Sequence, residues 1–197
     1  MIKRILATLA LLSISTPAFA AFKDVPVGHR YRNAIWFAES QGMVQGFKGG
    51  WFKPEQPMLR GEFLSIVMGL RPWGIDEPEC DDLAWIPMDV SQHDWFFPAV
   101  QKASKYGIIR GFEDSTFKPH GILQMADAAV ILARAYGLIT VEEQMELEQT
   151  TTWYWPAAQA LAARGILKSA DIMPNKAITR GEAVAMIVAL EKASPKK

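Results

Sequence analysis

"GFKGGWFKPEQPMLRGE" at residues 46–62 recurs in altered form as "GFEDSTFKPHGILQMAD" at residues 111–127. Both stretches begin with Gly-Phe, and the Phe-Lys-Pro of each falls at the same place. Similarity at a fixed spacing indicates a repeat architecture, so the repeating unit decides the fold. The copies differ at one conspicuous position, where the first has Arg60 and the second has Met125.

The segments upstream of these copies also repeat, and they reveal a third unit. "DWFFPAVQKASKYGII" (94–109) aligns without a gap with "TWYWPAAQALAARGIL" (152–167), and "HRYRNAIWFAESQGMV" (29–44) aligns with both. Trp95 and Trp153 occupy the same position, which is Arg30 in the first copy. The chain therefore divides into repeat 1 (21–70), a Pro- and acid-rich linker (71–87), repeat 2 (88–137), a helical connector (138–151) and repeat 3 (152–192).

Each unit predicts two short amphipathic helices. The apolar residues of each helix follow the spacing i, i+3, i+4, i+7, which forms one face of an α-helix. In the first helix they are Tyr31, Ala34, Ile35, Ala38; Phe96, Ala99, Val100, Ala103; and Tyr154, Ala157, Ala158, Leu161. In the second they are Phe63, Ile66, Val67, Leu70; Ala128, Ile131, Leu132, Ala135; and Ala183, Met186, Ile187, Leu190. One such pair cannot bury its apolar face alone, so the three pairs are expected to share one core in an all-α fold.

The N-terminus is typical of a signal peptide. Lys3 and Arg4 precede a short apolar run, and Ala18-Phe19-Ala20 is a small-x-small cleavage signal, which predicts removal of residues 1–20. Without them the chain has 19 basic and 21 acidic residues, a net charge of −2. This near-neutral balance argues against nucleic-acid binding. No later apolar run is long enough to span a membrane. The expected location is the periplasm, the cell surface or the cell wall.

The repeats resemble the S-layer homology (SLH) domain family. The residues that carry the resemblance are "FKDV" (22–25), "MDVS" (88–91), "GMVQGFKGGWFKP" (42–54), "GIIRGFEDSTFKP" (107–119), "LRGE" (59–62) and "TRGE" (179–182). The resemblance implies a three-pronged arrangement of helix pairs, hence a pseudo-threefold helical bundle. It also implies non-covalent binding of cell-wall polysaccharide, or of a polymer linked to peptidoglycan, through an acidic or pyruvylated sugar in grooves between neighbouring repeats.

The resemblance also suggests which residues line the grooves. The candidates for polysaccharide binding are Arg60, Arg180, Trp95, Trp153, Asp24, Asp89, Gly46 and Gly111. Three departures from the family pattern stand out: Arg30 replaces the first tryptophan, "QMAD" (124–127) has no arginine, and the third loop is three residues shorter.

Each candidate also has a structural interpretation. Thr179 and Glu182 fit a capping box. A cation in the first turn of a helix opposes the macrodipole, so Arg60 and Arg180 require either a bound anion or a carboxylate partner. We considered Asp24 and Asp89 as such partners, and also as residues that cap turns. Helix N-terminal amides beside a guanidinium would make a carboxylate site. The tryptophans serve either as core wedges or as surfaces on which sugar rings stack.

The sequence does not indicate an enzyme, a cofactor or a metal site. His29, His93 and His120 with the single Cys80 form no metal-ligand pattern, and no nucleophile elbow or phosphate loop occurs. The acidic segment 76–82 lacks the ligand spacing of an EF-hand. Two functions are favoured: a module that binds wall polysaccharide, and an exported module with degenerate sugar sites that binds a protein partner. A hydrolase that uses an unmarked pair of carboxylates is a third, less favoured class.

Overall fold

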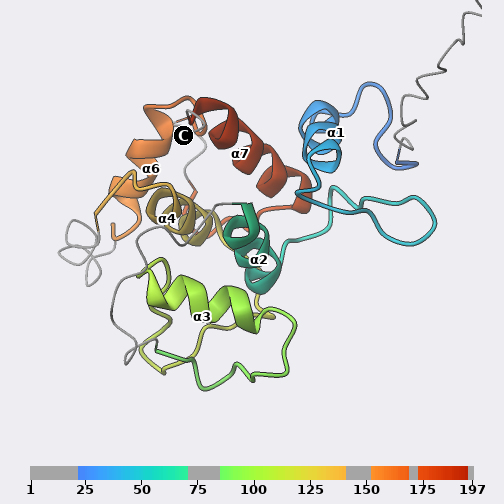
Figure 1. Cartoon of the computed structure of the whole chain (residues 1–197). Helices are drawn as coiled ribbons and strands as arrows, with labels where there is room; N and C mark the ends of the chain where they lie inside the picture. Colours follow the sequence, from blue (N-terminus) through green and yellow to red (C-terminus); the bar gives the residue numbers. More distant parts are fainter. Residues whose placement is uncertain (1–21, 71–84, 141–151, 169–172, 195–197) are drawn as a thin grey trace, which may run out of the picture.

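The computed structural model describes residues 22–70, 85–140, 152–168 and 173–194. These residues form helices without any β-strand, which confirms the all-α fold class (Figure 1). The helices are α1 (Arg32–Ser40), α2 (Arg60–Leu70), α3 (Phe97–Lys105), α4 (Met125–Ala135), α6 (Trp155–Ala162) and α7 (Arg180–Ala193). Within these ranges, no helix is long and apolar enough to cross a membrane.

The backbone geometry explains where several of these helices begin and end. Pro98 and Pro156 lie in the first turns of α3 and α6, where a missing N–H costs least. Gly42 and Gly107 follow the ends of α1 and α3 with φ of +69° and +66°. These are left-handed residues that stop a helix, and glycine adopts this conformation without a Cβ penalty.

The two helices of one repeat do not form the main packing pairs. Instead α1 packs on α7, α3 on α2, and α6 on α4 (Figure 1). In each pair the first helix of one repeat packs on the second helix of the preceding repeat. The arrangement is cyclic, because the first helix of repeat 1 packs on the second helix of repeat 3. This cyclic exchange confirms the predicted pseudo-threefold bundle.

A ring of three backbone hydrogen bonds marks the pseudo-threefold axis. Leu123 N–H donates to Met58 O (2.8 Å), Ile178 N–H to Leu123 O (3.1 Å), and Met58 N–H to Ile178 O (3.0 Å). All three side chains are fully buried. Each residue lies just before the second helix of its repeat, so the ring fixes the three helix N-termini relative to one another.

The core is shared between repeats. A large buried cluster contains residues of all three, including Phe63, Leu132 and Ile187, and a smaller one joins Ile35 and Phe52 of repeat 1 to α7. Burying one large aliphatic or aromatic side chain contributes about 1.5–3 kcal/mol. Since these contacts cross repeat boundaries, cooperative unfolding of the bundle stays our prediction.

Several predictions fall on residues outside the described ranges. They are the signal peptide (1–20), most of the linker (71–87) with Cys80, and most of the connector (138–151).

Candidate functional site

The N-terminus of each second helix is built in the same way. The first two amides of α2, α4 and α7 donate to carbonyl oxygens of the next repeat's loop. The pairs are Arg60 to Gly121 and Gly61 to Pro119, Met125 to Lys176 and Ala126 to Pro174, and Arg180 to Gln56 and Gly181 to Pro54, at 2.8–3.1 Å. The expectation that these amides bind an anion is therefore corrected, because they already have partners. Any anion at this place depends on the guanidinium groups.

Arg60 is held by an ion pair that we did not predict. Its Nη1 lies 2.8 Å from Oδ1 of Asp127 on α4, and its Nε donates to Phe117 O at 2.9 Å. The guanidinium also lies 4.9 Å from the ring centroids of Phe112 and Phe117, and the residue is 7% exposed. The partner is thus Asp127 rather than Asp24 or Asp89.

One methylene group explains why Asp127 is available to Arg60. The equivalent residues of the other repeats, Glu62 and Glu182, reach back to accept the amides of Leu59 (3.2 Å) and Thr179 (3.0 Å). At Thr179 the capping box is complete, as predicted. Asp127 is shorter, no side chain caps α4 at Gln124, and the carboxylate pairs with the neighbouring repeat instead.

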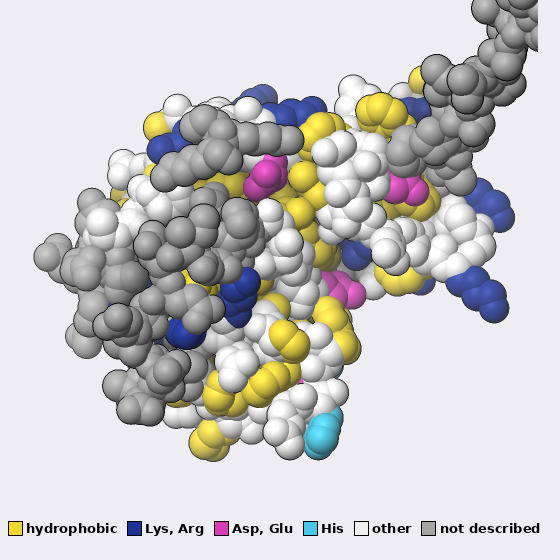
Figure 2. Space-filling model, in the orientation of Figure 1, with side chains coloured by type: hydrophobic (Ala, Val, Ile, Leu, Met, Phe, Trp, Pro, Cys, Tyr) yellow, Lys and Arg dark blue, Asp and Glu magenta, His cyan; other side chains and the backbone are white. Residues whose placement is uncertain are grey.

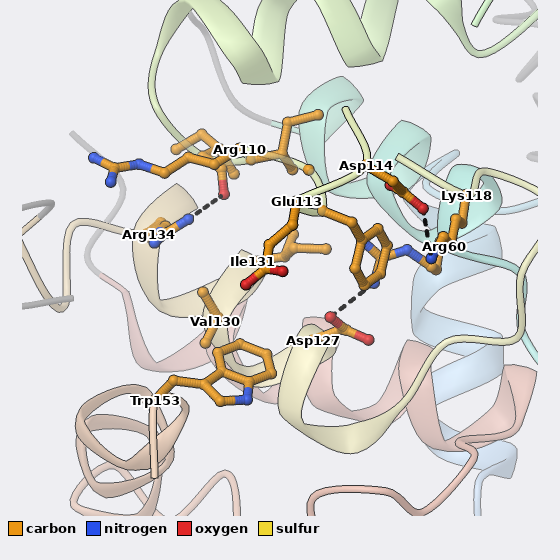
Figure 3. A pocket seen from close by; sticks show the side chains of 14 residues that line it. Arg60, Arg110, Glu113, Asp114, Lys118, Asp127, Val130, Ile131, Arg134 and Trp153 are labelled. Atoms are coloured by element: carbon orange, nitrogen blue, oxygen red, sulfur yellow. Dashed lines mark hydrogen bonds and ion pairs between the residues drawn. The ribbon is translucent and has the colours of Figure 1, made fainter. Parts of the chain in front are cut away.

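Arg60 lies at the edge of a cavity of about 740 Å³, which we call the Arg60 pocket (Figure 3). The loop 108–114 with Lys118, the α4 side chains from Asp127 to Arg134, and Trp153 of repeat 3 line it. Among its charged groups, Lys118 pairs with Asp114 at 3.2 Å and Arg134 donates to Ile108 O at 3.4 Å, and Arg110 and Glu113 also line it. The pocket brings together three of the predicted residues, Arg60, Gly111 and Trp153.

Arg180 has a similar position but different partners. Its Nη2 donates to Gln45 O at 2.8 Å, and its guanidinium lies 5.1 Å from the ring centroid of Phe47 and 4.7 Å from that of Phe52. We call these four residues the Arg180 site. Within the described residues no carboxylate lies at ion-pair distance from Arg180, and its buried Nε has no hydrogen-bond partner.

Burial dominates the electrostatics of Arg180. The residue is 9% exposed, and desolvation lowers the pKa of its guanidinium, an effect that the Glu62 carboxylate partly opposes. Glu62, which accepts the Leu59 amide, acts on Arg180 through its charge and not through an ion pair. The structure thus contains a buried cation that lacks a counter-ion in the described part of the chain.

Asp24 and Asp89 bind their own loops. The carboxylate of Asp24 accepts the amides of Phe52 (2.9 Å) and Lys53 (2.7 Å). Asp89 accepts the equivalent amides of Phe117 and Lys118, both at 2.8 Å. Lys53 and Lys118 have φ of +59° and +56°, so each aspartate stabilises a left-handed turn. Of the roles that we considered, the turn-capping one is confirmed.

The two candidate glycines allow close packing. A Cβ on Gly46 would collide with the Phe22 ring, and a Cβ on Gly111 would collide with the Trp85 ring and lie 2.6 Å from Thr116 O. Gly111 also has φ of +76°, which favours glycine. Both glycines therefore have a structural reason to be there.

The two candidate tryptophans differ in exposure. Trp95 is 64% exposed and packs edge-on against Phe96, with centroids 5.3 Å apart. Trp153 is half-buried, packs against the main core and lines the Arg60 pocket.

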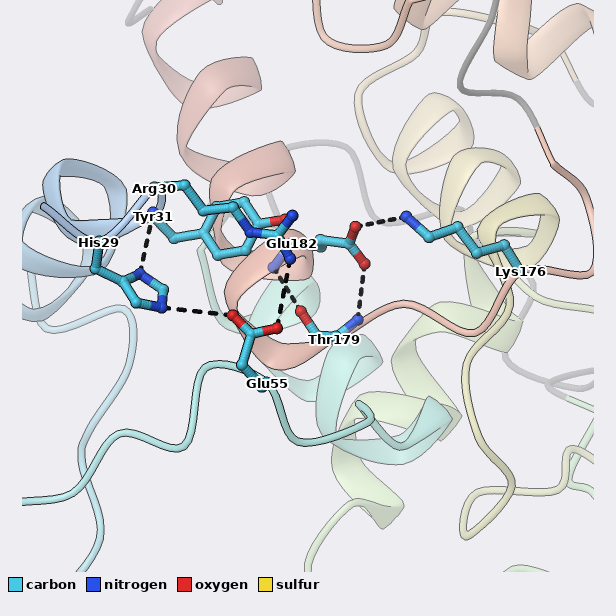
Figure 4. A network of polar contacts seen from close by, with 7 residues as sticks. All are labelled: His29, Arg30, Tyr31, Glu55, Lys176, Thr179 and Glu182. Carbon is cyan, nitrogen blue, oxygen red and sulfur yellow. Dashed lines mark hydrogen bonds and ion pairs between the residues drawn. The ribbon is translucent and has the colours of Figure 1, made fainter. Parts of the chain in front are cut away.

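The third equivalent position, Met125, has no arginine. A separate polar network lies between repeat 1 and repeat 3 (Figure 4). Glu55 contacts both His29 and Arg30 at 3.4 Å, and Lys176 pairs with Glu182 at 2.5 Å. Tyr31 lies between these groups, and burial together with the Glu182 charge raises its pKa to about 12.

Comparison with known proteins identifies the family. The S-layer homology domain matches residues 21–64, 89–129 and 149–184, one match per repeat. The chain belongs to the S-layer homology domain family.

The SLH repeats of this chain also match longer proteins. The middle cell wall protein of Brevibacillus brevis is 26% identical over 94% of the chain, and the S-layer protein sap of Bacillus anthracis is 27% identical over 91%. The exoglucanase XynX of Acetivibrio thermocellus is 34% identical over 66% of the chain. The chain spans 17%, 22% and 12% of these relatives' lengths.

The sequence analysis did not identify Asp127, whose carboxylate forms the ion pair with Arg60 in the Arg60 pocket. A signal was present, since Asp127 stands where the other two repeats have Glu62 and Glu182. The prediction noted the lost arginine at Met125 but not the shortened acid two residues later.

Proposed function

We propose that the chain is a non-catalytic cell-envelope module that binds acidic wall polysaccharide, such as a pyruvylated sugar, with Arg180 as its anion-binding residue. Family membership and the similarity to S-layer and cell-wall proteins support a structural module that anchors at the cell surface. The finer assignment, to an acidic sugar at Arg180, rests on the charges around that residue.

The observation that carries the proposal is the buried guanidinium of Arg180, which has no counter-ion among the described residues and whose Nε has no hydrogen-bond partner there. Burying a charge without a counter-ion is unfavourable, and its pKa is accordingly lowered. A ligand carboxylate would supply the missing charge, and a guanidinium can hold a carboxylate with two parallel hydrogen bonds. The rings of Phe47 and Phe52 beside it would exclude water from that contact.

The neighbouring loop also favours an anion. Between Gly46 and Pro54 it contains Lys48 and Lys53 but no acidic residue, and Lys53 lies over Phe47 at 4.5 Å. Figure 2 shows basic side chains projecting where the loop between α1 and α2 lies in Figure 1. Such a field would raise the local concentration of an acidic polymer.

Binding to wall material tests this function directly. Purified cell-wall sacculi should retain the protein, and sacculi stripped of their secondary polysaccharide should not. Arg180→Met should weaken retention, while Lys102→Met, which removes a basic residue from α3 far from Arg180 in sequence, serves as a charge-matched control. Equal retention on stripped sacculi would contradict the proposal.

A second function has one observation in its favour. Of the four exposed tryptophans in the described residues, Trp36 at 54% and Trp95 at 64% are the most exposed, and aromatic residues are enriched in protein interfaces. An envelope protein that binds a protein partner through them would be captured equally well by cells with and without the polysaccharide. Trp36→Ala and Trp95→Ala would then abolish capture, whereas Arg180→Met would not.

A further inference from the structure

We infer that the loop between α1 and α2 docks on an anionic lipid bilayer through its end, residues 47–51, which we call the aromatic tip. This inference goes beyond the proposed function, because it concerns the exposed end of the loop and not the buried guanidinium of Arg180. Three features carry it: the exposed rings of the tip, the lysines around them, and the contrast with the same loop of repeat 2.

The aromatic tip is a tight turn that holds two rings towards solvent. Phe47 N–H donates to Trp51 O at 2.6 Å, and Gly50 N–H donates to Phe47 O at 3.2 Å. Gly49 and Gly50 have φ of +89° and +79°, a conformation that favours glycine. Trp51 is 44% exposed and Phe47 is 37% exposed. The turn therefore places apolar surface at the end of a loop, where no other described part of the chain covers it.

Lysines surround both rings. Lys23 Nζ lies 5.9 Å from the centroid of the Trp51 ring, and Lys53 Nζ lies 4.5 Å from that of Phe47. Lys48 follows Phe47 in the tip and is also exposed. Figure 2 shows basic side chains projecting on the side of the molecule where this loop lies in Figure 1. Aromatic rings beside basic groups are typical of segments that lie in the interface of an anionic bilayer.

The polar groups of the tip match lipid phosphates. Between residues 46 and 51 the polar side-chain groups are the Lys48 ammonium and the Trp51 indole N–H, and both only donate hydrogen bonds. The nearby Asp24 carboxylate is used by two backbone amides of the loop. A lipid phosphodiester only accepts hydrogen bonds, and the acyl layer below it can bury the rings. An acidic polysaccharide offers anions as well, but it has no apolar layer of that kind.

Repeat 2 shows that the turn forms without these residues. Its loop has the same bond, from Phe112 N–H to Thr116 O at 2.8 Å. In this copy Glu113 replaces Lys48, and Thr116 replaces Trp51. The backbone design thus requires neither the lysine nor the tryptophan, which leaves both side chains for a role at the surface.

Co-sedimentation with lipid vesicles tests the inference. The protein should bind vesicles that contain phosphatidylglycerol about tenfold more tightly than vesicles of phosphatidylcholine alone, and salt should weaken this binding. Trp51→Thr, which introduces the side chain found in repeat 2, should weaken binding about tenfold, because it removes an indole from the interface. Lys48→Glu should weaken it about 30-fold, because a basic group is lost and an acidic one is gained.

Two variants on the opposite side of the bundle are matched controls. Figure 1 shows α6 across the molecule from the loop between α1 and α2. Trp155→Thr removes a tryptophan of similar exposure, 40%, from the start of α6. Arg164→Glu, just after α6, makes the same change in net charge as Lys48→Glu. Both should bind anionic vesicles within about twofold of the unmodified protein, and losses equal to those of the loop variants would overturn the inference.

The outcomes separate this inference from the proposed function. If the protein ignores anionic vesicles, or binds phosphatidylcholine vesicles equally well, the inference is wrong and the proposed function stands. The inference is also wrong if Trp51→Thr weakens retention on sacculi but leaves vesicle binding unchanged, because the tip then belongs to the polysaccharide site. If vesicles bind as expected and sacculi do not retain the protein, the inference stands and the proposed function fails.

Discussion

Arg60 and Arg180 are equivalent in sequence, yet their surroundings differ in charge. Both begin a second helix, both donate their amide to the next loop, and both lie against two phenylalanine rings. Arg60 has Asp127 at 2.8 Å, whereas Arg180 has no carboxylate at ion-pair distance in the described ranges. The difference teaches that a repeated motif fixes the place of a side chain, while one neighbouring residue decides whether it is structural or open to a ligand.

The neighbouring loops follow the same division. The loop beside Arg180 contains Lys48 and Lys53, and the loop beside Arg60 contains Glu113 and Asp114 as well as Arg110 and Lys118. In that second loop Lys118 pairs with Asp114 at 3.2 Å, so its charge is largely compensated. Two repeats of one backbone design therefore differ in local charge, since residues 45–54 contain two basic and no acidic residues, whereas residues 110–119 contain two of each.

The largest expected effect is on stability, and it should separate the two arginines. Arg60→Met leaves Asp127 without its partner and should lower the free energy of unfolding by about 3 kcal/mol. Arg180→Met removes one hydrogen bond to Gln45 O and should cost about 1 kcal/mol. Urea denaturation of both variants checks this difference.

The matched control is the double variant Arg60→Met with Asp127→Leu. Replacing a buried ion pair with apolar side chains is often neutral, so the double variant should recover most of the loss. Similar losses for the two single variants, or no recovery in the double, would mean that the ion pair is not what distinguishes Arg60.

A smaller difference is expected between the two loop glycines. Gly111→Ala should destabilise by about 2 kcal/mol, since it forces a positive φ on alanine as well as a collision with Trp85. Gly46→Ala meets mainly the Phe22 ring and should cost about 1 kcal/mol, because a side chain can shift. Thermal unfolding shows which of the two variants is less stable. A larger loss of stability in Gly46→Ala than in Gly111→Ala would contradict the claim that the positive φ of Gly111 makes the greater contribution.

The smallest effect concerns alkaline pH. Tyr31 packs on Gly181 beside Arg180, and the pKa of its phenol is raised from 10.0 to about 12. On the Arg60 side the equivalent contact to Gly61 comes from Phe96, whose ring has no titratable group. A raised pKa means that stability is fully present below pH 10 and is lost as the pH rises from 10 to 12. The melting temperature of the protein should therefore fall in that window more steeply than that of Tyr31→Phe. If the melting temperatures of the protein and of Tyr31→Phe fell equally between pH 10 and 12, a group other than Tyr31 would be responsible for the loss of stability.

Much of the fold could be predicted from the sequence because helix signals are local. The spacing of apolar residues, Pro98 and Gly107 are each interpretable within a few residues, and the helices they predict are present. The exchange of helices between repeats could not be predicted, because each pair joins helices of different repeats. The ring could not be predicted either, because Met58, Leu123 and Ile178 lie 55 to 120 positions apart in sequence.

The candidate site was predicted in part for the same reason. Comparing repeats finds positions such as Arg60, Arg180 and Trp153, but it does not find partners that lie across a boundary between repeats. Asp127 contacts Arg60 over 67 residues of sequence, and its role depends on the length of one side chain. The prediction that both arginines hold an anion therefore remains a proposal for Arg180 alone.

The central claim is that Arg180 is open to an anion and Arg60 is not. The most direct measurement is the affinity of acidic wall-polysaccharide fragments, by calorimetric titration, for Arg180→Met and for the Arg60→Met/Asp127→Leu double variant. Arg180→Met should lose a charge-assisted contact, weakening binding about 10- to 100-fold. The double variant should bind within about twofold of the unmodified protein, because it removes a cation that is already neutralised. Equal losses in both variants, or a loss confined to the double variant, would contradict the account.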